Sequence, residues 1–574
     1  MAQSFQFKQG LKSAVVTGFA VGIMALPTWA AELSGVISDT NGKPLEGAMV
    51  TLVNDEQKRM TTRYTNAHGK YQFDDVSPSN DSVRVRLIGF TDQQLPLSQG
   101  KTTLNTHLAS ATRDELLQQL PAHVWAERVA VDDNATRREF RIQCMMCHQQ
   151  GYPSARWPTD KEQWYGVFDR MAHKRALLTE ETRVTMADAL LSAYDVSEGK
   201  PLPRIPAAPT GVETQVEITE WRLDDFKASM HDVAVGPDGK IYAVDTVGND
   251  IWRLDPATNE IESLAHLKPK NRDEDIPMVL HTVIQAPDGA MWFTYAGGNL
   301  VARLDVFTEE MKVWEISYLD GVYPHTMRFD SNGQIWFTVT ITNQLGTIDP
   351  ETDEVVLYDM PTRSFKQTLA TWSPITLGLI WAQSKFEITT TSDPELMPAA
   401  YGIDITPDDK IWFSQFNNRR IGYFDKETEE FHMVDTPFGG PRRFRTDSKG
   451  NLWIPAYTDG LIYRYEPAKD KFTPFEMPTG RGDSTYALAV DPKDDTVWAC
   501  GSNSDSMMHL NPETGDVVTY RLPTRVTFCR EISFADDGSV WTSYSNYPSV
   551  SIEGGSSVFV RIKPLPDKSV VAAQ

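Results

Sequence analysis

Hydrophobic and polar residues alternate in short runs over residues 33 to about 110. The apolar runs cover residues 35–37, 48–53, 69–73 and 83–85, and turn signals such as Asn41-Gly42 separate them. Because alternation with a period of two directs every second side chain to one face, this region predicts a small antiparallel β-sandwich over residues 32–111.

Between residues 112 and 199 the pattern becomes helical. Apolar positions recur three and four residues apart from Asp114 onward and again over residues 137–143, 162–174 and 180–194. This spacing predicts a small all-α unit. A proline-rich stretch, residues 200–211, predicts a linker after it.

From residue 212 to residue 566 the chain repeats itself. Each repeat contains a turn, a strand such as Ile-Trp-Phe, a second turn, a strand ending near Asp-Pro, and a last strand such as "EVVLYDMP". The first strands of seven repeats begin, in order and mostly about 44 residues apart, at His231, His281, His325, Tyr401, Arg442, Tyr486 and Arg530. Four strands per repeat at this period predict a C-terminal seven-bladed β-propeller, with residues 567–574 as a tail.

Two repeats depart from the pattern. His325 and Tyr401 are 76 positions apart, so the third repeat carries an extension at roughly residues 362–399, which we expect to be functional or partner-facing. The last repeat lacks a fourth strand, whereas residues 214–224, ahead of the first repeat, read like that strand. We therefore expect the two ends of the repeat region to close the ring and remove the exposed sheet edge.

The N-terminus has the layout of a cleaved signal peptide. Lys8 and Lys12 precede an apolar run over residues 13–26, and small residues surround residue 30. We expect cleavage to remove residues 1–31 and deliver a periplasmic chain, and no later segment has the length and apolarity of a transmembrane segment. The formal net charge of −23 argues against a nucleic-acid partner and suits a basic protein partner.

One motif in the helical region carries recognisable chemistry. Cys144-Met145-Met146-Cys147-His148 supplies two thiols at the spacing that forms thioethers with haem vinyl groups, and a histidine that can ligate the iron. We therefore expect one covalent haem c. Cys500 and Cys529 stand apart from this motif, and their places at adjoining strands of neighbouring repeats predict a disulfide.

The three regions resemble known families. "SGVISDTNGKPLEGAMVTL" with "TNAHGKYQFDDV" resembles the carboxypeptidase regulatory-like, transthyretin-like module, which implies a fold and no catalysis. "CHQQGYPSARWPTDKEQWYGVFDRMAHK" is similar to small c-type cytochrome domains that accept electrons in periplasmic dehydrogenases. That likeness implies a methionine as sixth iron ligand and places Met171 there, with Met186 and His173 as rivals.

The repeats resemble the virginiamycin B lyase, or streptogramin lyase, family through "PDGAMWFT", "SNGQIWFT" and "PDDKIWFSQFNNRRIGYFD". The resemblance implies an acidic residue after the Trp-Phe-Thr phrase and a histidine in a neighbouring blade that hold Mg²⁺ for an elimination. The equivalent positions here are Asp245, Tyr295, Val339, Gln415, Ala456, Gly501 and Tyr544. Only Asp245 is acidic, so a site that needs several oxygen ligands is poorly supplied.

The first residues of the seven inner strands offer a different site. Sevenfold geometry would gather three histidines, two arginines and two tyrosines around one mouth of the channel, where they could bind a substrate or act on it. The arginines suit an anionic ligand.

The fold class expected is therefore multidomain and mainly β, with a sandwich, a cytochrome c domain and a propeller. The first functional hypothesis is an oxidoreductase or electron-transfer protein in which the mouth binds a small molecule or docks a redox partner such as a dehydrogenase. The second is a carbon–oxygen lyase that uses Mg²⁺ in the propeller, and the third is a pure scaffold.

Overall fold

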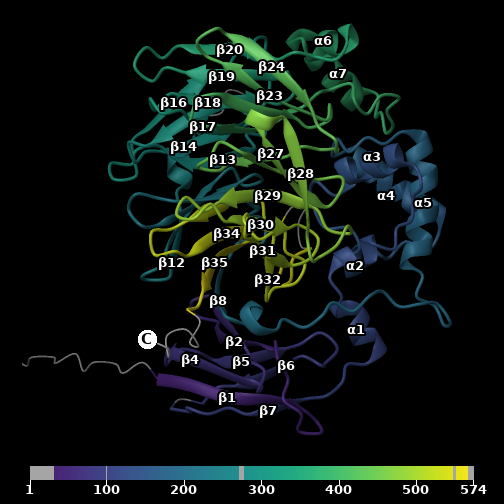
Figure 1. Cartoon of the computed structure of the whole chain (residues 1–574), viewed down its shortest axis with the longest axis vertical. Helices are drawn as coiled ribbons and strands as arrows, with labels where there is room; N and C mark the ends of the chain where they lie inside the picture. The colour runs from purple at the N-terminus through teal and green to yellow at the C-terminus, as the bar shows by residue number, and fades with distance from the viewer. Residues whose placement is uncertain (1–30, 99, 270–276, 547–550, 567–574) are drawn as a thin grey trace, which may run out of the picture.

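The computed structural model describes residues 31–98, 100–269, 277–546 and 551–566, so the predicted signal peptide before Ala31 and the predicted tail lie outside it. The chain is mainly β, with a small sandwich at one end, a large group of radiating sheets, and helices along one side (Figure 1). None of the described helices is long and apolar enough to cross a membrane.

The sandwich contains seven strands in two sheets. One sheet has the order β4-β1-β7, and strands β3, β2, β5 and β6 lie in the other. The strands are β1 (Ala31–Asp39), β2 (Met49–Asn54), β3 (Arg59–Tyr64), β4 (Lys70–Val76), β5 (Ser82–Arg86), β6 (Gln93–Pro96) and β7 (Thr106–Leu108). Four of them, β1, β2, β4 and β5, coincide with the apolar runs of the sequence, and alternate residues of β3 and β4 are buried.

The helical unit follows, and each of its longer helices begins after a side chain that can cap it. Asp133, Asp160 and Thr179 accept hydrogen bonds from backbone N–H groups three residues ahead, as N-cap residues do. The helices are α1 (Arg113–Gln119), α2 (Ala122–Ala126), α3 (Asn134–Cys144), α4 (Lys161–Ala172) and α5 (Glu180–Tyr194). The helical pattern of the sequence is thereby confirmed, and α2 is an addition to it.

Six four-stranded antiparallel sheets make up most of the remainder. They are β9 (Met230–Val235), β10 (Ile241–Asp245), β11 (Ile251–Asp255) and β12 (Glu260–Ser263); β13 (Leu280–Gln285), β14 (Met291–Tyr295), β15 (Leu300–Leu304) and β16 (Met311–Glu315); β17 (Pro324–Phe329), β18 (Ile335–Val339), β19 (Gln344–Ile348) and β20 (Val355–Asp359); β21 (Ala400–Ile405), β22 (Ile411–Gln415), β23 (Arg420–Asp425) and β24 (Glu430–Asp435); β25 (Arg445–Thr446), β26 (Leu452–Ala456), β27 (Leu461–Glu466) and β28 (Lys471–Glu476); and β29 (Thr485–Val490), β30 (Val497–Gly501), β31 (Ser506–Leu510) and β32 (Val517–Arg521).

In each sheet the second strand is more buried than the fourth strand. Every residue of the second strands β10, β14, β18, β22, β26 and β30 is buried, whereas the fourth strands β12, β16 and β28 are mostly exposed or half-buried. The first strands β9, β13, β17, β21, β25, β29 and β33 (Ile532–Phe534) contact one another in that order, and β33 contacts β9. The first strands therefore form a closed ring, as a propeller requires.

The chain ends close this ring as expected. Strand β8 (Val216–Arg222) pairs antiparallel with β35 (Val558–Pro564), which continues through β34 (Val540–Tyr544) to β33. The sequence did not indicate that β8 has a second neighbour. Its other edge pairs with β3 of the sandwich, so one eight-stranded sheet runs from the propeller into the N-terminal module.

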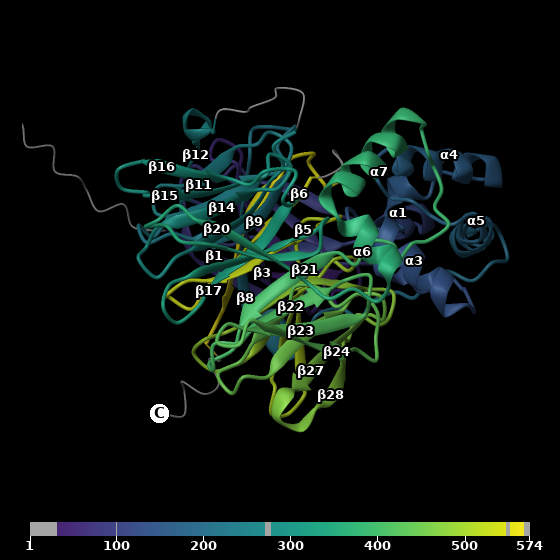
Figure 2. The ribbon, with the colours of Figure 1, turned by 90° about the horizontal axis from the view of Figure 1, so that it is seen from above.

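The extension of the third repeat forms two helices, α6 (Phe365–Thr371) and α7 (Ser373–Lys385), which lie beside the helical unit (Figure 2). Arg175 after α4 donates to the side chain of Gln383 on α7, and Leu178 forms a backbone bridge with Thr390. The extension therefore contacts another part of the same chain, and its functional or partner-facing role stays a prediction.

Candidate functional site

The structure brings the seven residues of the predicted ring together. His231, His281, His325, Tyr401 and Tyr486 occupy the second position of their strands, and the two arginines lie just before β25 and β33. The histidine rings follow one another at tilted angles, with centroids 3.9 Å apart between His231 and His281 and 4.0 Å apart between His281 and His325. We call these seven residues the ring cluster.

The ring cluster closes through hydroxyl and guanidinium contacts. The hydroxyl oxygens of Tyr401 and Tyr486 are 2.9 Å apart, and the Tyr486 hydroxyl lies 3.3 Å from Nε2 of His231. Nη2 of Arg442 donates to the Tyr401 hydroxyl at 2.7 Å, while its guanidinium carbon stands 3.5 Å from the centre of the Tyr486 ring. The site is thus a continuous band of imidazole, phenol and guanidinium groups.

Burial and neighbouring arginines set the charge of this band. Desolvation and nearby charges hold the pKa values of His231, His281 and His325 well below the ordinary value, so these imidazoles are neutral near pH 7. Desolvation by itself raises the pKa of Tyr486, but the charges of Arg442, Arg530 and Arg443 outweigh it and lower that pKa to about 8.

A layer of ion pairs adjoins the ring cluster. Arg443, which is fully buried, lies 2.7 Å from a carboxylate oxygen of Asp232 and 2.9 Å from one of Glu531. Arg445 pairs with Glu531 at 2.6 Å. Sequence reasoning missed these residues. For Asp232, Arg443 and Glu531 the available signal was a charged residue directly after a ring position.

The acidic positions do not assemble a magnesium site. Asp245 ends β10, and its Oδ1 accepts backbone N–H groups of Ser229, Val247 and Gly248 at 2.8–2.9 Å, which is the geometry of a turn cap. The seven positions equivalent to Asp245 all fall on the last residue of a second strand, so the alignment of the repeats is confirmed.

A second group of candidate metal ligands consists of two histidines of the ring cluster and the adjoining Asp232. Ligand atoms of His231, Asp232 and His281 all lie within 4.8 Å of one another. Arg443 already neutralises the Asp232 carboxylate at 2.7 Å, and guanidinium charge disfavours a cation beside it. One paired carboxylate also falls short of the oxygen ligands that Mg²⁺ prefers.

The cysteine motif lies directly on the ring cluster. Cys144 ends α3, and Arg530 donates to the carbonyl oxygens of Cys147 at 2.8 Å and of Met146 at 3.3 Å. The Tyr457 hydroxyl donates to the carbonyl of Met145, whose side chain packs against Tyr401, Phe416 and Tyr457. Residues 145–150 therefore lie over the ring cluster, and its role as a binding or catalytic mouth stays a prediction.

Further contacts fix this loop to the last two sheets. The side chain of Gln149 donates to Asp505 at 2.8 Å and to the carbonyl of Thr527 at 2.7 Å, and the backbone N–H of Gln150 donates to Asn503 at 2.9 Å. Gln149 is almost fully buried by these contacts.

The donor set of the motif fits a c-type haem. Nδ1 of His148 lies 2.8 Å from the Gln149 carbonyl oxygen, and donation to that oxygen leaves Nε2 free to bind iron. Desolvation lowers the pKa of His148, which favours the neutral imidazole that a metal requires. Cys144 and Cys147 are half-buried thiols whose pKa values are raised by burial.

The three candidates for a sixth ligand have different surroundings. Met171 is half-buried in the last turn of α4, whereas Met186 is fully buried on α5 in an apolar cluster against which Cys144 packs. His173 is exposed, and its Nδ1 contacts the carbonyl of Asp169. Met171 as the ligand stays a prediction.

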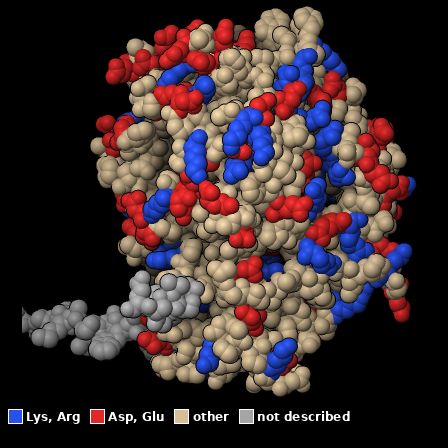
Figure 3. Space-filling model, viewed as in Figure 1, with Lys and Arg blue, Asp and Glu red and all other residues tan. Residues whose placement is uncertain are grey.

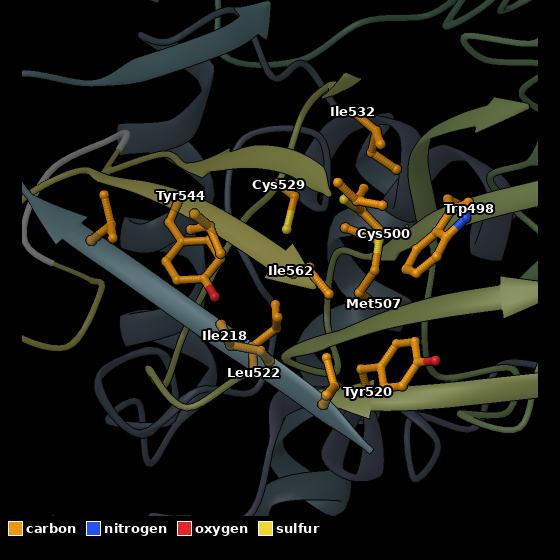
Figure 4. Close-up of a cluster of buried hydrophobic side chains, with 14 of the residues drawn as sticks. Ile218, Trp498, Cys500, Met507, Tyr520, Leu522, Cys529, Ile532, Tyr544 and Ile562 are labelled. Atoms are coloured by element: carbon orange, nitrogen blue, oxygen red, sulfur yellow. The ribbon is translucent and has the colours of Figure 1, made fainter. Parts of the chain in front are cut away.

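Cys500 and Cys529 meet in one buried cluster at the boundary between two sheets (Figure 4). Both are thiols in the structure, and burial, together with hydrogen bonding to Cys529, raises the pKa of Cys500 well above its ordinary value. The disulfide therefore stays a prediction.

Two segments of the chain match described families. Residues 32–109 match the carboxypeptidase regulatory-like domain, and residues 385–565 match the Virginiamycin B lyase family. No curated protein matches the chain. The helical unit that carries Cys144, Cys147 and His148 lies outside both segments.

Solved structures show the same similarity at low sequence identity. A streptogramin B lyase is 17% identical over 62% of this chain and 99% of its own, with a TM-score of 0.48. The virginiamycin B lyase of Staphylococcus aureus is 16% identical over 61% of this chain and 99% of its own, with a TM-score of 0.47. The family matches thus show a similarity of residues 32–109 to the carboxypeptidase regulatory-like domain and of residues 385–565 to the Virginiamycin B lyase family.

Proposed function

We propose that the protein is a periplasmic c-type haem protein that transfers electrons to or from a molecule at the ring cluster of a seven-bladed propeller. The observation that carries this proposal is the position of the Cys-x-x-Cys-His loop on the ring cluster, where Arg530 donates to the Cys147 and Met146 carbonyls. A redox group attached there would lie beside polar side chains that converge from seven sheets.

The chain's own residues would divide the work. Cys144 and Cys147 would hold the haem, His148 would bind the iron through Nε2, and Met171 would complete the ligand set. The haem supplies one-electron oxidation and reduction when bound. The neutral imidazoles of the ring cluster and the Tyr486 hydroxyl can hold or release a proton beside it. An acidic chain of formal net charge −23 suits a basic redox partner.

The test separates haem attachment from the role of the ring cluster. Periplasmic expression should give a protein that keeps haem after denaturation, and Cys147→Ala should lose most of that covalent haem. In the intact protein, His281→Ala or His325→Ala should slow haem reduction by the molecule that gives electrons at the ring cluster at least tenfold. Neither substitution should change the haem spectrum. His266→Ala, at an exposed histidine outside the ring cluster, is the control.

Full covalent haem in Cys147→Ala would refute the attachment site. A rate of haem reduction that no substitution in the ring cluster changes would instead indicate that the propeller is a docking scaffold.

A second candidate is a carbon–oxygen lyase, which the match of residues 385–565 to the Virginiamycin B lyase family favours. The engagement of Asp245 with three backbone N–H groups argues against it. Magnesium-dependent turnover of a virginiamycin-type lactone, lost with chelator or in Asp245→Ala and independent of haem redox state, would establish this alternative.

A further inference from the structure

Arg442 is a buried cation without a carboxylate partner. It is fully buried, and no ion pair among the described residues includes it. Its Nη2 donates to the Tyr401 hydroxyl, but Nε and Nη1 have no hydrogen-bond partner. Because an unpaired charge is costly to bury, this arrangement points to a missing anion.

Arg530, two repeats further along the chain, has similar surroundings. It is 4% exposed, its terminal nitrogens donate only to backbone carbonyls, and its Nε has no partner. Both guanidinium groups face the same phenol, since their central carbons lie 3.5 and 5.0 Å from the centre of the Tyr486 ring. Arg443 differs, because Asp232 and Glu531 neutralise it.

The surroundings indicate the kind of anion. The guanidinium carbon of Arg442 lies 4.4–5.3 Å from the ring centres of Tyr401, Phe416 and Tyr457. Planar guanidinium groups match the geometry of a carboxylate, and aromatic walls suit an apolar body attached to it. The Met145 side chain packs on these same aromatic rings, and an unbranched methionine can move aside.

We propose that Arg442 and Arg530 form a binding site for a small organic carboxylate, which takes the place of the Met145 side chain against the aromatic walls. The small organic carboxylate would be the substrate class of the proposed function. Its role as a substrate rests on that proposal. Haem propionates are a less suitable source, because they leave the porphyrin on the edge opposite the thioethers, whereas Arg530 is bonded to the backbone of Cys147 itself.

The test is calorimetric titration of the full-length, haem-loaded protein with acetate and with benzoate, at constant ionic strength held with sodium chloride. We expect benzoate to bind more tightly than acetate, Arg442→Met and Arg530→Gln each to weaken binding at least tenfold, and Met145→Ala to strengthen it. Arg419→Met, at an exposed arginine, is the matched control and should bind as the unaltered protein does.

Thermal unfolding provides a second measurement, in which Arg442→Met should increase the measured quantity and not decrease it. Since Arg442 is buried without a carboxylate partner, Arg442→Met should raise the melting temperature of the carboxylate-free protein and abolish the further rise that benzoate gives. A lower melting temperature in Arg442→Met without ligand would show that the arginine is a structural group and would overturn the proposal, as would equal benzoate binding by both proteins.

Two further outcomes distinguish this proposal from the proposed function. Carboxylate binding that depends on Arg442 in a protein without covalent haem would keep the site and refute the haem assignment. Absent carboxylate binding, together with a changed haem midpoint potential in Arg442→Met, would assign the arginine to a propionate and overturn the carboxylate site.

Discussion

Tyr486 differs from Tyr401 in the ring cluster because its pKa is lowered, whereas that of Tyr401 is raised by burial. Arginine charges lower its pKa to about 8, against an ordinary value of about 10, so the folded protein favours the phenolate. The resulting stabilisation is present in full above about pH 10 and is lost as the pH falls through about 8. We expect one tyrosine to ionise near pH 8 in the unaltered protein.

The measurement is the tyrosinate absorbance difference between the unaltered protein and Tyr486→Phe across this pH range. Tyr401→Phe should move the transition to higher pH, because hydrogen bonding to Tyr401 contributes to the lowered pKa. An identical titration of the unaltered protein and Tyr486→Phe between pH 7 and pH 9 would contradict the assignment.

The residues of the ring cluster could be predicted because each lies at or just before the start of the first strand of its repeat, and repetition places them on the same side. Asp232, Arg443 and Glu531 could not, because each follows a ring position and its partner comes from another sheet. The role of Asp245 could not be predicted either, since its carboxylate accepts hydrogen bonds from backbone N–H groups, which no sequence pattern indicates. Periodicity thus finds equivalent positions, and the contacts between sheets decide what they do.

Among the elements, β8 joins two modules. Ile218, at its centre, is fully buried in the same cluster as Val560 and Ile562 of β35. Ile218→Ala should lower the free energy of unfolding by about 2–5 kcal/mol through the cavity it leaves. Urea unfolding measures this, with Val212→Ala, at a 54% exposed side chain, as a control that should change little.

An Ile218→Ala protein as stable as the unaltered one would mean that the last sheet does not depend on β8. The sequence predicted β8 as the closing strand because its pattern fits the missing fourth strand of the last repeat. It gave no sign of the pairing with β3, because an edge-to-edge contact between modules leaves both alternation patterns unchanged.

On the scale of the whole molecule, the modules predicted as separate units are joined. Acidic and basic side chains are interspersed over the face shown in Figure 3, and the stronger connections lie inside. Arg86 of β5, nearly buried, pairs with Asp92 at 3.0 Å and with Glu553, in the loop between β34 and β35, at 2.5 Å. Arg521 at the end of β32 donates to the carbonyl of Ala207, so the proline-rich segment lies against the propeller and does not act as a free linker.

These connections predict cooperative unfolding. Chains with several modules usually unfold in steps, but here the sandwich shares a sheet with the propeller and the helical unit is bonded to its mouth. We expect calorimetry of the full-length protein to show one endotherm. Arg86→Gln should separate an earlier transition of the sandwich, because it removes the charge that holds Asp92 and Glu553 together. Burial raises the pKa of Glu553, but Arg86 outweighs it and lowers that pKa to about 2, so the variant leaves Glu553 without its main partner. Well-separated endotherms in the unaltered protein would show that the shared sheet does not couple the modules.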